Sequence, residues 1–169
     1  MEHTILEKKQ LSEQVYMMRV AAPLIAEARK PGQFIILQID TDFGERIPLT
    51  IADANAEEGW IRIIFQAVGG TTMKLAEFEE GEAVAAVLGP LGHPTHIENF
   101  GRAVCVGGGI GVAPMFPIVQ ALKKAGEGRS ERKVGVSSAT FHVTPKAMAK
   151  ERARKHRERE ARRLERQSK

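Results

Sequence analysis

The 169-residue chain has one cysteine, Cys105, and few aromatic side chains. One cysteine cannot form a disulfide within the chain, and it cannot assemble a thiolate-ligated zinc site or an iron–sulfur cluster. We therefore expect no metal site and no iron–sulfur cluster in this chain. Cys105 stands in an apolar run between Val104 and Val106. A small thiol in such a run is typical of core packing, so we predict that Cys105 belongs to the core.

Long apolar runs are also missing, and none approaches the roughly 18 residues of a membrane span. The first thirty residues mix charged and apolar positions, without the continuous apolar stretch of a secretory signal. These absences predict a cytoplasmic protein with no membrane partner.

Positive charge is scarce in the body of the chain and dense at its end. Residues 1–128 hold 11 Lys and Arg against 16 Asp and Glu, whereas residues 129–169 hold 14 against 5. The net charge of +4 therefore combines an acidic body with a basic tail, which indicates two segments of different origin or role. The tail has no aromatic residue after Phe141, so nucleic acid is not an expected partner beyond unspecific phosphate contacts.

Short strands are the dominant pattern between residues 3 and 88. Residues 15–20, 34–40 and 60–68 are rich in β-branched or large apolar side chains, and turn residues separate them. In the third run three apolar positions alternate with three others, namely Ile61, Ile63 and Phe65 with Arg62, Ile64 and Gln66. This period of two is typical of a half-buried antiparallel strand. We predict a small barrel or a sandwich over residues 1–98, with one short helix near residues 71–78.

The pattern changes after residue 100. An apolar run at residues 103–106 leads into a glycine run, and an amphipathic helix is predicted over residues 114–124. Strand, glycine turn and helix form the first unit of a parallel α/β sheet, to which residues 132–140 could add a second strand. We predict a partial α/β nucleotide-binding unit over residues 99–137 and a charged tail, helical or disordered, over residues 138–169.

Arg46, Pro48, Leu49 and Thr50 form the first stretch with chemical potential. An arginine can pair with a phosphate, and a hydroxyl after a rigid proline can bond the edge of a heteroaromatic ring. By itself, the same pattern is more typical of an edge strand with a surface arginine.

Gly70, Thr71 and Thr72 form the second stretch, at a predicted helix start. Free N–H groups and hydroxyls at a helix N-terminus make an anion site. Taken alone, they are more typical of a capped helix start.

The third stretch contains Gly107, Gly108, Gly109, Gly111 and Pro114. It is not the G-x-G-x-x-G fingerprint, because the last spacing is one residue short. A glycine turn between an apolar strand and a helix still suits a pyrophosphate, the alternative being a structural turn.

Together and in this order, the three stretches resemble the ferredoxin–NADP reductase superfamily. The similarity is greatest to the branch of the dihydroorotate dehydrogenase electron-transfer subunit and the small subunit of NADH-dependent ferredoxin–NADP oxidoreductases. It extends from Ile5 to about Gly126 and includes Lys30-Pro31-Gly32-Gln33-Phe34 and Gly89-Pro90-Leu91-Gly92. The resemblance implies an antiparallel, Greek-key β-barrel of the flavin-binding type, followed by a nucleotide-binding domain.

The resemblance also implies site residues. Pro48, Leu49 and Thr50 would lie against the flavin ring of FAD, with Arg46 near its pyrophosphate. The residues that would present backbone to the cofactor are Ile64, Phe65 and Gln66, and those that would hold its phosphates are Gly70, Thr71 and Thr72. The residues that would face NAD(P)H are Gly107, Gly108, Gly109, Gly111 and Pro114. None of these side chains is required as a catalytic acid or base, because the flavin carries the redox chemistry.

The implied function is an FAD-dependent oxidoreductase subunit that transfers electrons between NAD(P)H and a larger redox subunit or a ferredoxin-like acceptor. Two departures qualify this expectation. Many relatives have arginine where this chain has Ile47, and members of the branch continue through a complete nucleotide domain to a cysteine-rich cluster segment. We therefore expect a truncated or frame-shifted product, and the alternative function is a flavin-binding remnant that cannot bind NAD(P)H productively.

Overall fold

The computed structural model describes residues 3–41, 44–126, 134–135 and 138–140. Its elements follow in chain order: β1 (His3–Ser12), β2 (Val15–Ala21), α1 (Pro23–Ala28), β3 (Phe34–Gln38), β4 (Arg46–Asn55), β5 (Trp60–Gln66), α2 (Gly70–Glu77), β6 (Ala83–Val84), β7 (Ala86–Leu91), β8 (Val106–Gly108), the 3₁₀ turn η1 (Gly109–Gly111), α3 (Val112–Gly126), β9 (Val134–Gly135) and β10 (Ser138–Thr140). Among these described residues, no helix is both long enough and apolar enough to cross a membrane.

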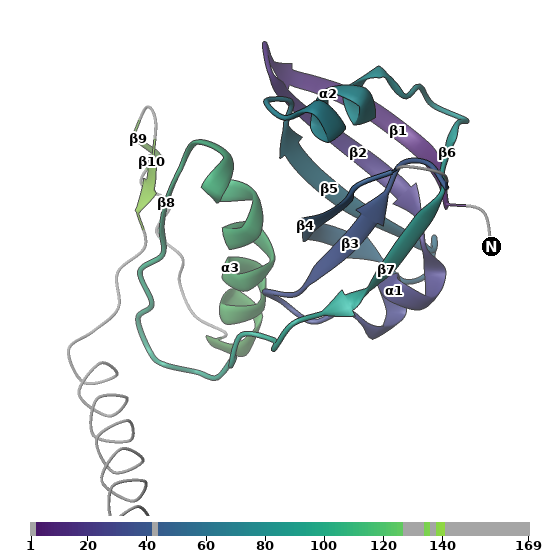
Figure 1. Ribbon diagram of the computed structural model, residues 1–169. Coiled ribbons are helices and arrows are strands. Elements are labelled where there is room, and N and C mark those ends of the chain that lie inside the picture. The colour runs from purple at the N-terminus through teal and green to yellow at the C-terminus, as the bar shows by residue number, and fades with distance from the viewer. Residues whose placement is uncertain (1–2, 42–43, 127–133, 136–137, 141–169) are drawn as a thin grey trace, which may run out of the picture.

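The first seven strands form one antiparallel sheet in the order β6-β1-β2-β5-β4-β3-β7 (Figure 1). Only Ala85 separates the two outermost strands, β6 and β7, so the sheet must curl back on itself into a nearly closed barrel. The N–H of Ala85 donates to the carbonyl of Ile39 at 3.1 Å, within the usual range. Strands β3, β4 and β5 are consecutive neighbours, and β2 lies beside β5, which is a Greek-key arrangement. The predicted antiparallel Greek-key barrel is confirmed.

The period-two pattern of β5 explains how the barrel fills. Ile61, Ile63 and Phe65 are buried, whereas the residues between them lie on the other face of the strand. Because successive side chains of a strand point to opposite faces, one face of each strand can serve the core and the other solvent or a ligand. The same alternation in the other strands completes the core, whose larger members include Ile5, Met18, Val20, Ile35, Leu37, Ile51 and Leu75.

A buried glutamine connects two segments that carry the family resemblance. The side chain of Gln33, only 9% exposed, accepts a hydrogen bond from the N–H of Lys30 at 2.8 Å. Its amide nitrogen donates to the carbonyl of Gly92 at 2.9 Å. The N–H of Thr95 also donates to the carbonyl of Pro31 at 2.9 Å. The turn before β3 and the end of β7 are therefore tied to each other where the chain leaves the barrel.

The two longer helices agree with the predicted ones. Helix α2 begins at Gly70, one residue before the predicted start, and ends at Glu77. Helix α3 extends from Val112 to Gly126, with two lysines in its last turn, and it packs against β4 (Figure 1). Pro117 lies inside α3 and is buried, so the helix continues although one of its backbone hydrogen bonds cannot form.

The region after the barrel differs from the prediction in two respects. Strand β8 begins at Val106 and consists mainly of glycine, whereas residues 103–105 are not in a strand. Its neighbour is β10, which pairs with it antiparallel, and β9 pairs with β10 antiparallel as well. The expected parallel second strand is therefore wrong within the described residues, because the antiparallel strand β10 supplies the backbone partners of β8 instead. Residues 141–169 of the predicted tail lie outside the described residues.

Candidate functional site

Strand β4 changes its pairing partner halfway along its length. Its first half, Arg46 to Thr50, pairs with β3, and its second half, from Ile51 onward, pairs with β5. The register with β5 begins at Ile51 opposite Ile63 and contains a bulge before Asp53. Residues 64–66 of β5 pair with β2 on their other side. We call the stretch between residues 46–50 and 64–66 the β4–β5 opening; backbone polar groups along it are available to a ligand.

The Arg-x-Pro-Leu-Thr residues occupy both faces of β4. Leu49 packs against the core. Because side chains alternate along a strand, Arg46, Pro48 and Thr50 lie on the opposite, outer face. The Nε of Arg46 donates to the side-chain oxygen of Gln38 on β3 at 3.2 Å. The outer residues of β4 therefore share the face on which a ligand of the β4–β5 opening would lie, whereas Leu49 could offer only its backbone.

The predicted residues of β5 divide in the same way. Phe65 is 2% exposed and stacks on Tyr16 with 5.9 Å between ring centroids. Its side chain belongs to the core and only its backbone can serve a ligand. Ile64 and Gln66 lie on the outer face and line a cavity. This division confirms the period-two interpretation of the strand.

The start of α2 uses one hydroxyl internally and leaves its first N–H groups outside the helix ladder. The Oγ1 of Thr72 accepts from the N–H of Gly69 at 3.0 Å and donates to the carbonyl of Gly69 at 3.0 Å. Met73 is the donor of the bond to Gly69 that begins the helix. The N–H groups of Gly70, Thr71 and Thr72 precede that donor, as in every helix N-terminus. Space around Gly70 is open, since an added Cβ would meet no atom within 4 Å.

A carboxylate already lies beside this helix start. The hydroxyl of Thr71 donates to Oε2 of Glu45 at 2.5 Å, which joins the residue before β4 to the first turn of α2. Sequence reasoning did not single out Glu45, because its partner is 26 positions away. An incoming phosphate would meet this negative charge at the same hydroxyl.

The glycine run, which extends from β8 into η1, contains two kinds of glycine. Gly107 is packed, because an added Cβ would lie 3.3 Å from the side chain of Met115. At Gly108, Gly109 and Gly111 an added Cβ would meet nothing within 4 Å, although the positive φ of Gly109 favours glycine there. Close packing within the chain thus accounts for Gly107 only. Pro114 is half-buried in the first turns of α3.

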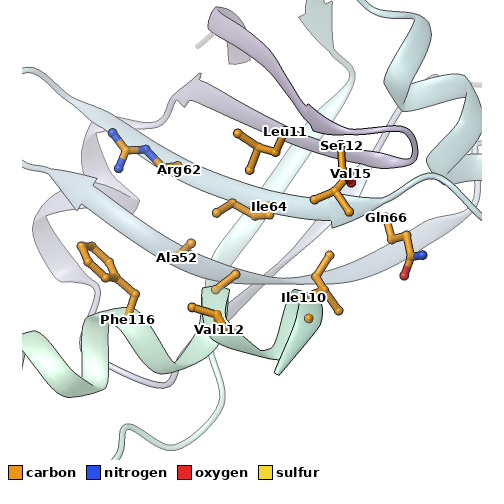
Figure 2. A pocket seen from close by; sticks show the side chains of 12 residues that line it. Leu11, Ser12, Val15, Ala52, Arg62, Ile64, Gln66, Ile110, Val112 and Phe116 are labelled. Carbon is orange, nitrogen blue, oxygen red and sulfur yellow. The ribbon is translucent and has the colours of Figure 1, made fainter. Parts of the chain in front are cut away.

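A cavity of about 600 Å³ lies between the outer face of the barrel and the start of α3 (Figure 2). That volume is within the range of small-molecule and cofactor sites. The residues that line it on the barrel side are Leu11, Ser12, Val15, Ala52, Arg62, Ile64 and Gln66, and those on the other side are Gly109, Ile110, Val112, Ala113 and Phe116. The cavity is mostly apolar and joins Ile64 and Gln66, at the β4–β5 opening, to Gly109 of the glycine run. Of the three predicted stretches, the glycine run alone contributes a predicted residue to the described cavity lining, namely Gly109; the stretches at 46–50 and 70–72 do not line it.

One charged residue of the cavity wall was not foreseen. Arg62 lines the cavity and its Nη1 is paired with Oδ2 of Asp53 at 3.0 Å. The two residues are opposite each other in the β4–β5 register, so the pair depends on strand pairing that a single sequence does not reveal.

Cys105 is half-buried in the segment before β8 and is not part of the core cluster, so the predicted core position is wrong. Partial burial still removes water from its sulfur, and this desolvation raises the pKa of the thiol above 9.0. The residue is a neutral thiol at physiological pH.

An apolar cavity beside exposed strand backbone and a helix N-terminus suits a flat, partly apolar ligand that carries phosphate. The backbone groups of the β4–β5 opening can bond the polar edge of a ring, and the N–H groups at the start of α2 can bond an anion. Nothing in this arrangement requires a side-chain acid or base.

Comparison with known proteins finds similarity to electron-transfer subunits and ferredoxin reductases. No family model matches the chain. It is 43% identical over 122 residues to the "Dihydroorotate dehydrogenase B (NAD(+)), electron transfer subunit homolog" of Thermotoga maritima, a match that covers 72% of this chain and 43% of the relative. It is 32% identical over 128 residues to the "Dihydroorotate dehydrogenase B (NAD(+)), electron transfer subunit" of Geobacillus thermodenitrificans, covering 73% of this chain and 49% of the relative.

Solved structures with a similar fold are also ferredoxin oxidoreductases or reductases. The structure described as that of the NADH-dependent reduced ferredoxin-NADP oxidoreductase, which concerns flavin-based electron bifurcation, superposes with a TM-score of 0.72 at 41% identity and covers 75% of this chain and 45% of that chain. The ferredoxin reductase in carbazole 1,9a-dioxygenase has a TM-score of 0.64 at 22% identity over 74% of this chain and 40% of that chain, which shows the shared fold. The chain spans less than half the length of the curated relatives it matches.

Proposed function

Because the chain belongs to the ferredoxin–NADP reductase superfamily, we propose that it is an FAD-binding oxidoreductase subunit that transfers electrons between NAD(P)H and a partner redox protein or larger redox subunit. The observation that carries this proposal is the β4–β5 opening. There, strand pairing ends at Ile51 and Ile63, and the outer face of both strands leads into an apolar cavity.

The residues present fit FAD on two grounds. Open space at Gly70, where a Cβ would meet nothing, lets a phosphate approach the N–H groups of α2. The apolar cavity, with Ile64 and Gln66 on its floor, can enclose an aromatic ring system. When bound, FAD would supply the conversion between two-electron and one-electron transfer.

We propose the following residues as its contacts. Pro48 and Thr50 would lie against the ring from the outer face of β4, with Arg46 directed toward the pyrophosphate. Leu49 and Phe65 would contribute backbone groups, because their side chains face the core. Ile64 and Gln66 would contribute backbone and cavity wall. The phosphate contacts would come from Gly70, Thr71 and Thr72, through backbone N–H groups more than hydroxyls, since Thr72 is already hydrogen-bonded within its turn.

The proposed NAD(P)H contacts are Gly107, Gly108, Gly109, Gly111 and Pro114, at the start of α3. We propose that the barrel unit ends near residue 98 and that residues 99–137 form the nucleotide-binding unit. The pairing of β10 with β8 supports extending the proposed nucleotide-binding unit to residue 140.

Replacement of Gly70 by Leu tests the FAD proposal. A leucine there occupies open space over the helix start without touching the barrel, so the fold should be retained while FAD is excluded. Binding is followed through the visible spectrum and quenching of FAD fluorescence, and folding through the thermal unfolding curve. Lys74→Leu, which adds apolar volume elsewhere on α2, is the control. If the wild-type chain takes up no FAD, or if Gly70→Leu binds it equally well, the proposal is wrong.

A second candidate function is a flavin-binding protein that does not bind NAD(P)H productively. It is favoured by the antiparallel pairing of β8 with β10, since a dinucleotide normally lies across the C-terminal ends of several parallel strands. Stopped-flow mixing of the FAD-loaded chain with NADH and NADPH separates the two functions. Rapid bleaching of the flavin at micromolar nucleotide supports the reductase, and slow bleaching supports the second candidate.

A further inference from the structure

The cavity beside α3 has a single charged side chain among its twelve described lining residues, Arg62. Figure 2 shows Arg62 and Phe116 at one end of the cavity and Gln66 and Ile110 at the other. Arg62, Ile64 and Gln66 follow one another on the outer face of β5. At about 3.3 Å per residue they extend over roughly 13 Å of the cavity floor. The cavity is therefore apolar along its length and cationic at one end.

The guanidinium of Arg62 is held in place from two sides. Its Nη1 is 3.0 Å from Oδ2 of Asp53, and its Cζ lies 5.2 Å from the centroid of the Trp60 ring. Asp53 directly follows the bulge in β4 and is itself only 20% exposed. Its other oxygen, Oδ1, lies 3.6 Å from Nη2 of Arg29 at the end of α1. Asp53 therefore fixes Arg62 against the sheet and prevents it from swinging out into solvent.

Positive charge exceeds negative charge in this cluster. Asp53 forms ion pairs with both Arg62 and Arg29. Glu7 forms an ion pair with Arg19, in which Oε2 lies 2.6 Å from Nε. Three arginines thus share two carboxylates. Arg19 is also directly opposite Arg62 in the β2–β5 register, and like charges opposite each other in a sheet are destabilising. The cluster would be stabilised by one more negative charge.

Arg62 also has unused hydrogen-bonding capacity. Its Nε is buried without a partner among the described residues. A buried donor without a partner is unfavourable unless a ligand or water satisfies it. The charge count therefore favours an anionic or electron-rich group beside Arg62, and the cavity that Arg62 lines is where such a group can enter.

We propose that Arg62 is a residue that tunes the redox potential of a flavin in this cavity, by acting as a fixed positive charge that stabilises the reduced form. This inference rests on the proposed function. Two-electron reduction of oxidised flavin with uptake of one proton adds one negative charge to the ring, and a cation held in a cavity of low polarity favours the state with that charge. Asp53 is the positioning residue that holds the cation.

The chain offers a matched control for this role. Arg29 and Arg62 pair with the same carboxylate, but Arg62 alone of the two lines the cavity. Arg29→Gln therefore removes one positive charge and one ion pair with Asp53 without changing the cavity wall. Arg62→Gln removes the same charge and the same kind of pair from the wall itself, and Arg62→Lys restores the charge without the guanidinium fork.

The experiment uses the full-length chain loaded with FAD and reduced by dithionite in equilibrium with a redox dye. In Arg62→Gln, the ratio of reduced to oxidised flavin at a given dye potential should fall about tenfold, which is about 30 mV for a two-electron couple. Arg29→Gln should remain close to wild type, and Arg62→Lys should recover most of the loss. Thermal unfolding of each variant accompanies the titration, so that a general loss of structure is recognised.

Two results would overturn the inference in different ways. If Arg62→Gln and Arg29→Gln shift the potential equally, or if neither shifts it, FAD binding stands but Arg62 has no specific role. If the wild-type chain binds no FAD, the proposed function fails and the redox role of Arg62 fails with it.

Discussion

The side-chain amide of Gln33 donates to the carbonyl oxygen of Gly92 at 2.9 Å, across 59 positions of sequence. The side-chain oxygen of Gln33 accepts a hydrogen bond from the N–H of Lys30, so both the amide nitrogen and the amide oxygen of this glutamine have partners. This contact fixes the turn before β3 against the end of β7. It also fixes the point from which the chain proceeds to α3 and the far wall of the cavity.

Replacement of Gln33 by Leu should destabilise the barrel by about 1–3 kcal/mol, because two partly buried hydrogen bonds, from the N–H of Lys30 and to the carbonyl of Gly92, would be lost, each worth about 0.5–1.5 kcal/mol. Urea unfolding measures the difference. Gln14→Leu, at an exposed turn, is the control and should change the free energy of unfolding by less than about 0.5 kcal/mol. Equal losses in the two variants would show that the Gln33 contacts do not stabilise the barrel.

Replacement of Glu45 by Gln should tighten FAD binding roughly two- to fivefold. The carboxylate of Glu45 bonds the hydroxyl of Thr71 at the start of α2, where it repels an incoming phosphate. One charge at a helix N-terminus is worth about 0.3–1 kcal/mol, which converts to that range of affinity. Titration of FAD fluorescence at low salt measures the change, and Glu77→Gln at the other end of α2 is the control. Weaker binding by Glu45→Gln would mean that Glu45 supports the site.

The pKa of Cys105 can be followed directly, because it is the one cysteine of the chain. Burial raises its pKa above 9.0, so the folded state holds its proton to higher pH than the unfolded chain does. At neutral pH the thiol is protonated in both the folded and the unfolded chain, so it does not affect the free energy of unfolding. As the pH rises through 9.0 the unfolded chain releases the proton first, which lowers the free energy of unfolding. The rate of alkylation by iodoacetamide should therefore have its pH midpoint above that of the same chain in urea. Coinciding midpoints would show that the thiol is solvated.

Deletion of residues 141–169 should leave the melting temperature within a few degrees of the full chain. The segment has almost nothing apolar to bury, and the stability of a protein helix comes mainly from such burial. Ending the chain after Thr140 keeps β10, which pairs with β8. Differential scanning calorimetry of both forms gives the comparison, and a large loss would show that the segment packs on the rest of the protein.

Local patterns were sufficient to predict the barrel and most positions in it. The alternation in β5 identified which face of Ile61, Ile63 and Phe65 is buried, because the period of two is a property of strand geometry alone. The helices also agreed, since glycine before α2 and the two lysines at the end of α3 act within one turn.

Features that depend on pairing between distant segments could not be predicted in this way. The partner change of β4 after Thr50 and the bulge between Ile51 and Asp53 have no signature in a single sequence. The same holds for Glu45 beside Thr71 and for Asp53 beside Arg62. Composition predicts a strand over residues 103–106, yet the strand begins at Val106, where β10 provides its partner.

The near-closure of the barrel has a consequence for its behaviour without a ligand. Open sheet edges are the places where strands of other molecules add and aggregation begins. Here the outermost described strands are β6, of two residues, and β7, which is joined to it through Ala85. The β4–β5 opening, between residues 46–50 and 64–66, is a further stretch of strand backbone without a strand partner on that side. A cofactor seated there would also act as a protective cap, and the ligand-free chain should be the more aggregation-prone form.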